Sequence, residues 1–187
     1  MKSQVRIIGG EWRGRRLAVI DAAGLRPTPD RVRETLFNWL ARDCGNAVVL
    51  DCCAGSGALG LEALSRGAQH LVALERHPRA LDNLRAQAER LGGSAIEIIA
   101  GDVRESIARL ALQFDIVFID PPYDQPRLRT EILRRLEARQ CLRDGARVYF
   151  EWPRDEEFAL PSERLQWLKR KSAGQVKYGI AEWRVSR

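Results

Sequence analysis

The sequence lacks the features that mark membrane, secreted and zinc-binding proteins. In its 187 residues no apolar run approaches the roughly 20 residues that a membrane-spanning helix needs. Its beginning, MKSQVRIIGG, has no apolar stretch of signal-peptide type. There are two histidines, and the four cysteines (Cys44, Cys52, Cys53 and Cys141) have no zinc-type spacing. We therefore expect a cytoplasmic protein without a metal site, whose cysteines are buried, reduced thiols.

The length and the charge distribution indicate one domain and a polyanionic partner. A chain of 187 residues, 45% hydrophobic and 30% charged, is typical of one globular domain with a small appendage. The net charge of +6 is unevenly spread, with +5 in residues 1–42, −5 in residues 43–163 and +6 in residues 164–187. Two basic ends around an acidic centre suggest that the ends touch a polyanion, although a merely solvated basic surface is the alternative.

The N-terminal part predicts a small β-hairpin followed by a helix. Residues 5–20 look like two strands around a glycine-rich turn that is crowded with arginines. We assign residues 1–25 to this basic extension and residues 26–187 to the main domain. The sequence RPTPD then breaks the chain, and Thr28 or Asp30 can cap the helix that follows. No internal repeat is visible.

The rest of the chain alternates between apolar strands and helical patterns. We expect strands at 47–52, 70–75, 95–100, 114–120 and 146–152, with helices at 58–67, 77–91, 104–111 and 128–140. Strand–helix alternation favours an α/β fold with a doubly wound, mainly parallel sheet. The last two strands, near 165–171 and 177–185, have no long helix between them. They suit an antiparallel hairpin that completes a seven-stranded sheet.

A glycine-rich loop after the first of these strands indicates an adenosine-containing cofactor. In LDCCAGSGALG, Asp51 ends the strand and three glycines lead into a helix, whose N-terminus offers free N–H groups. Glu75 ends the next strand, where a carboxylate can accept both hydroxyls of a ribose. The expected cofactor contacts are Asp51, Ala54, Gly55, Ser56, Gly57, Glu75, Arg76, Asp102 and Val103.

The glycine spacing alone does not choose between a dinucleotide and S-adenosylmethionine. Asp51 would stand unfavourably beside a dinucleotide's phosphate, but it suits the cationic amino group of S-adenosylmethionine. Asp102, after the third strand, is placed to accept a bond from the adenine amine. Three carboxylates that end three successive strands therefore favour S-adenosylmethionine.

The strand at 114–120 ends in the corner Asp120-Pro121-Pro122-Tyr123, which predicts the catalytic site. An exocyclic amine of a base is a poor nucleophile, because its lone pair is shared with the ring. Acceptors on its N–H groups can draw the lone pair out of conjugation, and the Asp120 carboxylate and the Pro121 carbonyl are such acceptors. The prolines fix the backbone, and Tyr123 offers a face on which a base can stack. Asp at the first position slightly favours guanine, which presents two donors.

These motifs resemble class I S-adenosylmethionine-dependent methyltransferases that modify exocyclic amines. The sequence is most similar to the bacterial 16S ribosomal RNA (guanine-966-N2)-methyltransferases. The similarity rests on RIIGGEWRGRRL, RPTPDRVRETLFNWL, AGSGALGLEALSRGA, DPPY and KYG, and it spans nearly the whole chain. One departure is Cys52-Cys53, where such proteins carry bulky apolar residues.

The resemblance implies a Rossmann-like class I methyltransferase fold, S-adenosylmethionine as cofactor, and 16S rRNA as substrate. That substrate would be met in the small ribosomal subunit or an assembly intermediate, by a monomeric enzyme. Arg26 and Thr28 would line the mouth of the cofactor site, unless they only form the helix-capping turn. The residues expected to grip RNA phosphates are Arg6, Arg13, Arg15, Arg16, Lys169, Arg170, Lys171, Lys177 and Tyr178.

Three other functions stay open on the sequence. An adenine-N6 methyltransferase of DNA or RNA would use the same DPPY corner. A non-catalytic RNA-binding or S-adenosylmethionine-sensing module would not need the intact acidic residues. An NAD-dependent dehydrogenase would need an acid or base for hydride transfer, and we find no candidate.

Overall fold

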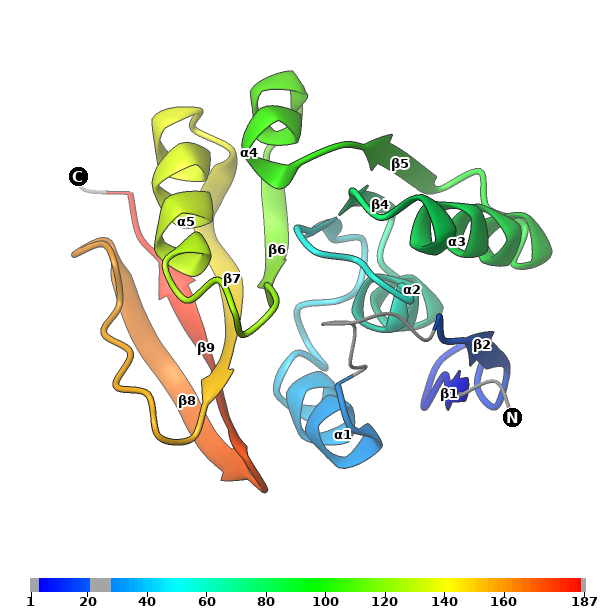
Figure 1. The fold of residues 1–187 in the computed structure, drawn as a ribbon, viewed down its shortest axis with the longest axis horizontal. Helices are drawn as coiled ribbons and strands as arrows, with labels where there is room; N and C mark the ends of the chain where they lie inside the picture. The colour runs from blue at the N-terminus through cyan, green and yellow to red at the C-terminus, as the bar shows by residue number, and fades with distance from the viewer. Residues whose placement is uncertain (1–3, 21–27, 186–187) are drawn as a thin grey trace.

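The computed structural model describes residues 4–20 and 28–185, which form a seven-stranded sheet, a separate small hairpin and helices on both faces of the sheet (Figure 1). The strand order is β5-β4-β3-β6-β7-β9-β8. The strands are β3 (Val48–Asp51), β4 (His70–Glu75), β5 (Ile96–Ala100), β6 (Phe114–Ile119), β7 (Leu142–Pro153), β8 (Leu165–Ala173) and β9 (Val176–Trp183). The first five in sequence pair in parallel, whereas β9 pairs antiparallel with β7 and β8. The predicted doubly wound sheet with an antiparallel C-terminal hairpin is confirmed.

Alternating side chains of the central strands build a core on each face of the sheet. Val49 packs with the helices α1 (Asp30–Trp39), α2 (Ala58–Ser65) and α3 (Pro78–Arg90), while Leu50 packs on the other face. That second face is covered by α4 (Val103–Ser106), the short 3-10 helix η1 (Ile107–Arg109) and α5 (Leu128–Ala138). Successive residues of a strand point to opposite faces, so the continuous apolar strands serve both cores. The carboxyl ends of β3, β4 and β6 therefore meet at one edge of a rigid, fully covered sheet.

The N-terminal hairpin forms its own two-stranded antiparallel sheet from β1 (Gln4–Arg6) and β2 (Arg16–Ala18). Its apolar side chains Val5, Ile7, Leu17 and Val19 are buried in the same core as α1 and α2. Glu62 of α2, fully buried, accepts hydrogen bonds from the backbone N–H groups of Ile8 and Gly9 at 2.7 and 2.8 Å. The hairpin is thus fixed to the helical layer by an apolar contact and by a carboxylate that binds its main chain.

Two local expectations are wrong, and both have a physical reason. Neither Thr28 nor Asp30 caps α1, whose cap position is Pro29 without a side-chain bond. The Thr28 hydroxyl donates to Asp120 instead, and the Asp30 carboxylate binds Arg6 and Arg33. The helix expected over 104–111 is a single turn, α4, that tightens into η1 before Leu110 becomes extended.

Two negative findings hold for residues 4–20 and 28–185. No helix there combines the length and the apolar character that crossing a bilayer requires. Nor do three or more His, Cys, Asp or Glu side chains come together in a way that could hold a metal ion. All four cysteines are free, and Cys53 is the one that is only partly buried.

Candidate active site

The glycine-rich loop joins β3 to α2 through two residues with positive φ. Gly55 has a φ of 54° and Gly57, the cap residue of α2, a φ of 77°. A Cβ atom at Gly57 would lie 2.6 Å from Cδ1 of Leu84 on α3, closer than atoms pack. The positive φ therefore favours glycine at this position, and the nearest atoms are the ends of the Leu84 and Leu61 side chains. Immediately after Asp51 the loop is held by backbone hydrogen bonds from Cys52 to Phe118 and from Ala54 to Leu74.

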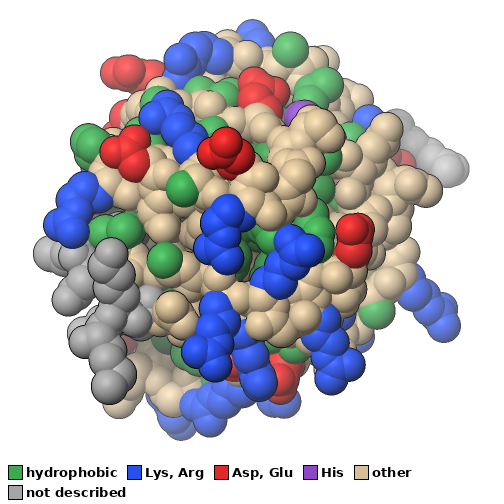
Figure 2. Space-filling model, turned by 90° about the vertical axis from the view of Figure 1, so that its right-hand side faces the viewer, with side chains coloured by type: hydrophobic (Ala, Val, Ile, Leu, Met, Phe, Trp, Pro, Cys, Tyr) green, Lys and Arg blue, Asp and Glu red, His purple; other side chains and the backbone are tan. Residues whose placement is uncertain are grey.

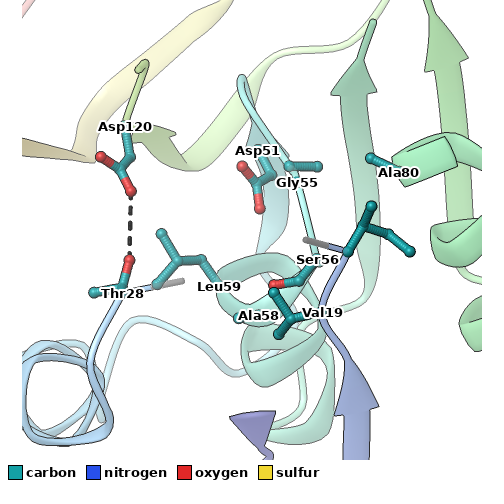
Figure 3. A pocket seen from close by; sticks show the side chains of 11 residues that line it. Val19, Thr28, Asp51, Gly55, Ser56, Ala58, Leu59, Ala80 and Asp120 are labelled. Carbon is teal, nitrogen blue, oxygen red and sulfur yellow. Dashed lines mark hydrogen bonds between the residues drawn. The ribbon is translucent and has the colours of Figure 1, made fainter. Parts of the chain in front are cut away.

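One side of this loop opens into a small acidic pocket (Figure 3). Asp51 and Asp120 project into it from the ends of the neighbouring strands β3 and β6. The remaining lining comes from β2 and its continuation, from Thr28, and from the glycine loop, α2 and α3: Val19, Ile20, Thr28, Ala54, Gly55, Ser56, Ala58, Leu59 and Ala80. No lysine or arginine stands among the described residues that line the pocket. An acidic pocket of this kind fits a cationic ligand and is unfavourable for a phosphate.

Burial raises the pKa values of both carboxyl groups. Burial raises the pKa of Asp51 from 3.8 to about 7, against the lowering effect of the Gly60 and Cys53 backbone N–H groups. The pKa of Asp120 is raised well above its usual range, first by burial and then by the charges of Glu151 and Asp51. A cation bound in the pocket would favour the ionised form of both groups. The pocket is therefore electrostatically prepared for positive charge.

A second pocket lies on the other side of the segment 51–55. It contains Glu75, Arg76, Asp102, Val103 and Pro122, all of which the sequence assigned to the site. Cys52, Cys53, Leu74, His77, Gly101, Asp124 and Leu128 complete its wall.

Glu75 organises the loops around this second pocket. Its carboxylate accepts from the backbone N–H groups of Gly55, at 2.7 Å, and of Arg76 and His77, at 2.8 and 2.7 Å. Asp102 caps α4 through the Arg104 N–H at 2.9 Å and forms ion pairs with Arg76 and Arg104. Both carboxylates keep lone pairs for hydroxyl or amine donors of a ligand.

The DPPY corner is supported by a buried carboxylate from the neighbouring strand. Glu151 of β7, 4% exposed, accepts from the hydroxyl of Tyr123 at 2.7 Å and from that of Tyr149 at 2.9 Å. Tyr123 itself remains 42% exposed. The hydroxyl end of the ring is therefore anchored in the interior. Part of the ring stays open to solvent beside Asp120.

Of the nine predicted RNA-contacting residues, seven are exposed, one is partly buried, and the prediction for Tyr178 is wrong. Arg6, Arg13, Arg15 and Arg16 are exposed on the hairpin, and Lys169, Arg170 and Lys171 are exposed on the edge strand β8. Lys177 is partly buried and donates to the Glu156 carbonyl. Tyr178 is 1% exposed and stacks on Trp39 with ring centroids 5.5 Å apart, so it belongs to the core and does not face a partner. Arg26 lies outside the described residues.

Sequence reasoning missed two contributors to the site, Glu151 and Arg129, and it noticed the pair Cys52-Cys53 without giving it a role. Glu151 could have been suspected as the one carboxylate inside the apolar strand VYFEW. The fully buried Arg129 of α5 pairs with Glu156, and its charge offsets part of the rise in pKa that burial causes at Asp120 and Tyr123. Its sequence context, LRTEILRR, resembles any amphipathic helix and gives no signal. Burial raises the pKa values of Cys52 and Cys53 well above the usual range, so these pocket thiols are protonated.

The two pockets together fit S-adenosylmethionine. The acidic pocket suits a ligand with cationic groups, and the second pocket presents carboxylates to a sugar and a base. The doubly wound sheet, the glycine loop and the strand-end carboxylates are those of a class I S-adenosylmethionine-dependent methyltransferase.

Comparison with known proteins then gives the family. The family model described as "Conserved hypothetical protein 95" matches residues 5–182, and the chain belongs to this family. It is 44% identical over 179 residues to "Ribosomal RNA small subunit methyltransferase D" of Escherichia coli K12, covering 95% of this chain and 89% of the relative. The Haemophilus influenzae protein of the same name is 39% identical, with 96% and 94% covered. The solved structure "Putative methyltransferase yhhF from Escherichia coli" has a TM-score of 0.89 at 40% identity and covers 98% of this chain and 100% of its own.

Proposed function

We propose that this protein transfers the methyl group of S-adenosylmethionine to the exocyclic N2 amine of a guanine in 16S ribosomal RNA. The observation that carries the proposal is that Asp51 and Asp120 line the same pocket, and that no described lysine or arginine lines it. The ring of Tyr123, anchored by its hydrogen bond to Glu151, lies beside this pocket. The names of the relatives, small-subunit rRNA methyltransferases, support the substrate class.

The cofactor contacts follow from the two pockets. Asp51 would bind the amino group of S-adenosylmethionine, Glu75 the ribose hydroxyls and Asp102 the adenine amine. Ala54, Gly55, Ser56 and Gly57 would lie along the cofactor, and Arg76 and Val103 would border the base. When bound, S-adenosylmethionine supplies an electrophilic methyl group next to a sulfonium charge.

The chain's own contribution to catalysis is positioning and proton acceptance. The Asp120 carboxylate and the Pro121 carbonyl accept the N–H bonds of the target amine, which localises its lone pair on nitrogen. Pro121 and Pro122 fix the direction of these acceptors. The acceptors are therefore already oriented before the reaction, and little conformational entropy is lost in reaching the transition state. Burial and the nearby Glu151 raise the pKa of Asp120, which suits Oδ of this residue to hold the proton that the methylated amine loses.

Basic residues that gather near the start of α1 support an RNA substrate. Arg6 of the hairpin binds Asp30 at the start of α1 at 3.1 Å. On the other side, the turn between β8 and β9 approaches α1, because a Cβ at Gly174 would lie 3.2 Å from Arg31 Nη2. The hairpin, the start of α1 and the β8–β9 turn are therefore neighbours. Figure 2 shows lysine and arginine side chains spread over the face that bears the hairpin.

The target base would leave its stack to reach Asp120 and would lie on Tyr123, which single-stranded RNA permits at low cost. We propose that the protein acts as a cytoplasmic monomer on the small subunit or on one of its assembly intermediates.

The test is nucleoside analysis by mass spectrometry of 16S rRNA from a deletion strain, incubated with the protein and S-adenosylmethionine. We expect N2-methylguanosine as the new product. Asp120→Ala should lose most methyl transfer, while S-adenosylmethionine binding measured by calorimetry changes much less. N6-methyladenosine as the product would replace the proposed substrate, and equal loss of binding and transfer would contradict the role of Asp120.

A further inference from the structure

We propose that Thr28 is a positioning residue for Asp120, and that the buried pair Arg33–Glu62 holds Thr28 in place by tying it to the N-terminal hairpin. This inference rests on the proposed role of Asp120. It assigns a task to three polar residues that the cofactor contacts leave unused. It also gives the hairpin a structural connection to the reacting group, in addition to any contact with RNA.

The first link is the hydrogen bond between Thr28 and Asp120. The Oγ1 atom of Thr28 donates to Oδ2 of Asp120 at 3.4 Å, as the dashed line in Figure 3 marks. Thr28 is 5% exposed, and within the described chain it is the one side chain that donates to this carboxylate. With Oδ2 held, Oδ1 keeps a fixed direction for accepting from the target amine. A hydroxyl donor also favours the ionised, acceptor-only form of the carboxyl group.

The second link is the grip of Arg33 on the backbone of Thr28. Arg33, on the first turns of α1, is fully buried. Its Nε donates to the carbonyl oxygen of Thr28 at 3.2 Å, and its Nη2 donates to Oδ1 of Asp30 at 2.7 Å. A planar guanidinium that binds residues 28 and 30 at once fixes the turn between them. The side chain of Thr28 is thereby aimed at the pocket.

The third link joins Arg33 to the hairpin through Glu62. Nη1 of Arg33 lies 3.6 Å from Oε2 of Glu62, and both side chains are completely buried. The same Glu62 accepts from the backbone N–H groups of Ile8 and Gly9 and from Nε of Arg66. Hydrogen bonds therefore join Glu62 to the hairpin and Arg33 to Thr28, and the step between Glu62 and Arg33 is an ion pair in which Nη1 of Arg33 makes no hydrogen bond to a described residue.

A purely stabilising role explains this arrangement poorly. Apolar side chains of similar volume usually stabilise a core as well as a buried ion pair does, because two charges must be desolvated. What the pair adds is direction: a guanidinium fork and a carboxylate fix the angles of the groups they bind. That property is needed where the orientation of Asp120 decides the reaction rate.

The experiment compares Thr28→Val, which keeps the shape but loses the hydroxyl, with Thr28→Ser, which keeps the hydroxyl. Thr35→Val is the matched control, because Thr35 lies on α1, the helix that begins two residues after Thr28, and its side chain bonds, among the described residues, only the Arg31 carbonyl. We expect Thr28→Val to lower kcat about tenfold, the loss typical of one hydrogen bond to a charged group, with a smaller change in KM for RNA. Thr28→Ser should recover most of the rate, and Thr35→Val should leave it unchanged.

The pH dependence of kcat separates a positioning role of Thr28 from a packing defect, because a packing defect does not shift the pKa of Asp120. The groups that shift the pKa of Asp120 are Asp51 from β3, Glu151 from β7, Arg129 from α5 and Thr28 itself. Cys53, Tyr123 and Tyr149 also lie within electrostatic range of Asp120, but their own pKa values are raised, so they stay uncharged. Thr28→Val removes a group that lowers the pKa of Asp120. The acidic limb of kcat should therefore move to higher pH in Thr28→Val and return in Thr28→Ser. A Thr28→Val enzyme with wild-type kcat and profile, or a loss that serine does not rescue, overturns the proposal.

The Arg33 link is tested with Arg33→Lys in a cycle with Thr28→Val. Since both act through the same carboxylate, the double variant should be no slower than the slower single variant, and additive losses would refute the link. Should Arg33→Lys not fold, Asp30→Ala replaces it, because Asp30 is 42% exposed and binds the same guanidinium.

Product identity in the same reactions separates the two hypotheses. If serine rescues the rate but the product is a nucleoside other than N2-methylguanosine, the proposed substrate fails and the positioning role stands.

Discussion

Glu151 shows what a single residue contributes to the site and why the sequence did not reveal it. Its carboxylate accepts hydrogen bonds from the hydroxyls of Tyr123 and Tyr149, although Glu151 stands 28 positions after Tyr123 in the chain. The DPPY corner was recognisable because its four residues are adjacent and their chemistry is distinctive. The partner that fixes the tyrosine comes from the neighbouring strand, and strand pairing at that distance is a tertiary property.

The anchored ring makes a prediction about Tyr123. Tyr123→Ala removes the stacking face and should raise the KM for RNA about tenfold or more, since stacking on an aromatic ring is worth roughly 1–3 kcal/mol per base. Tyr123→Phe keeps the face and loses only the bond to Glu151, so its KM should rise about threefold at most. Steady-state kinetics on the RNA substrate checks this. Tyr149→Phe, which loses an equivalent bond from a buried ring, is the control. Equal effects of Phe and Ala would remove stacking from the mechanism.

At the scale of elements, most strands and helices were predictable and the deviations cluster where tertiary contacts compete with local rules. The apolar runs located β3 to β6 within a residue or two, because buried parallel strands are continuous apolar segments. The strand β7 begins at Leu142, earlier than expected, and its pairing with β6 shifts register between Phe114 and Ile116. A polar, glycine-containing start such as LRDGAR does not resemble a strand. Its start is paired with β6, through Leu142 and Phe114, whereas β9 pairs with β7 only from Arg147 onward.

The hairpin is the element whose function is most directly testable. Replacing Arg13 and Arg15 by Glu should weaken RNA binding and lower the magnitude of the slope of log K against log salt by about 1 to 2, because two phosphate contacts are lost. Filter binding or anisotropy at several salt concentrations measures both quantities. The control places the same charge change at the exposed Arg134 of α5 and at Arg139, the cap residue at the end of this helix, which lies away from the hairpin in Figure 1. Unaltered affinity at low salt would exclude the hairpin from the interface.

At the scale of the whole molecule, the sequence predicted the charge pattern, but the fold was needed to bring its parts together. The two basic ends are separated by more than a hundred residues in the chain, yet both approach the start of α1. The acidic middle segment supplies the carboxylates that line the pockets. Burial could not be read from composition, which is why the raised pKa values of Asp51, Asp120 and Glu151 emerge only from the structure.

These buried carboxyl groups predict how stability depends on pH. An acid whose pKa is raised on folding favours the folded state at low pH and loses that contribution as the pH rises through the folded value. The pKa of Asp51 rises from 3.8 to about 7 on folding, so its contribution to stability is lost as the pH rises between these two values. Without cofactor, the melting temperature should fall by about 5 °C between pH 5 and pH 7.5.

Differential scanning fluorimetry tests this dependence. Asp51→Asn should flatten the decline, and saturating S-adenosylmethionine should reduce it in the wild-type protein. The partly buried Glu131 and Glu182 have pKa values lowered by arginine partners, so their contribution is lost only at more acidic pH. A wild-type melting temperature that rises steadily from pH 5 to pH 7.5 would contradict the assignment.

The way Glu62 binds the hairpin has a consequence for how this family can diversify. The carboxylate recognises two main-chain amides, so it is indifferent to the side chains that the loop displays to the outside. Substitutions along the arginine-rich tip can therefore accumulate without undocking it. Evolution, or an engineer grafting a foreign tip, can retune which RNA is gripped while the connection to the reaction centre stays intact.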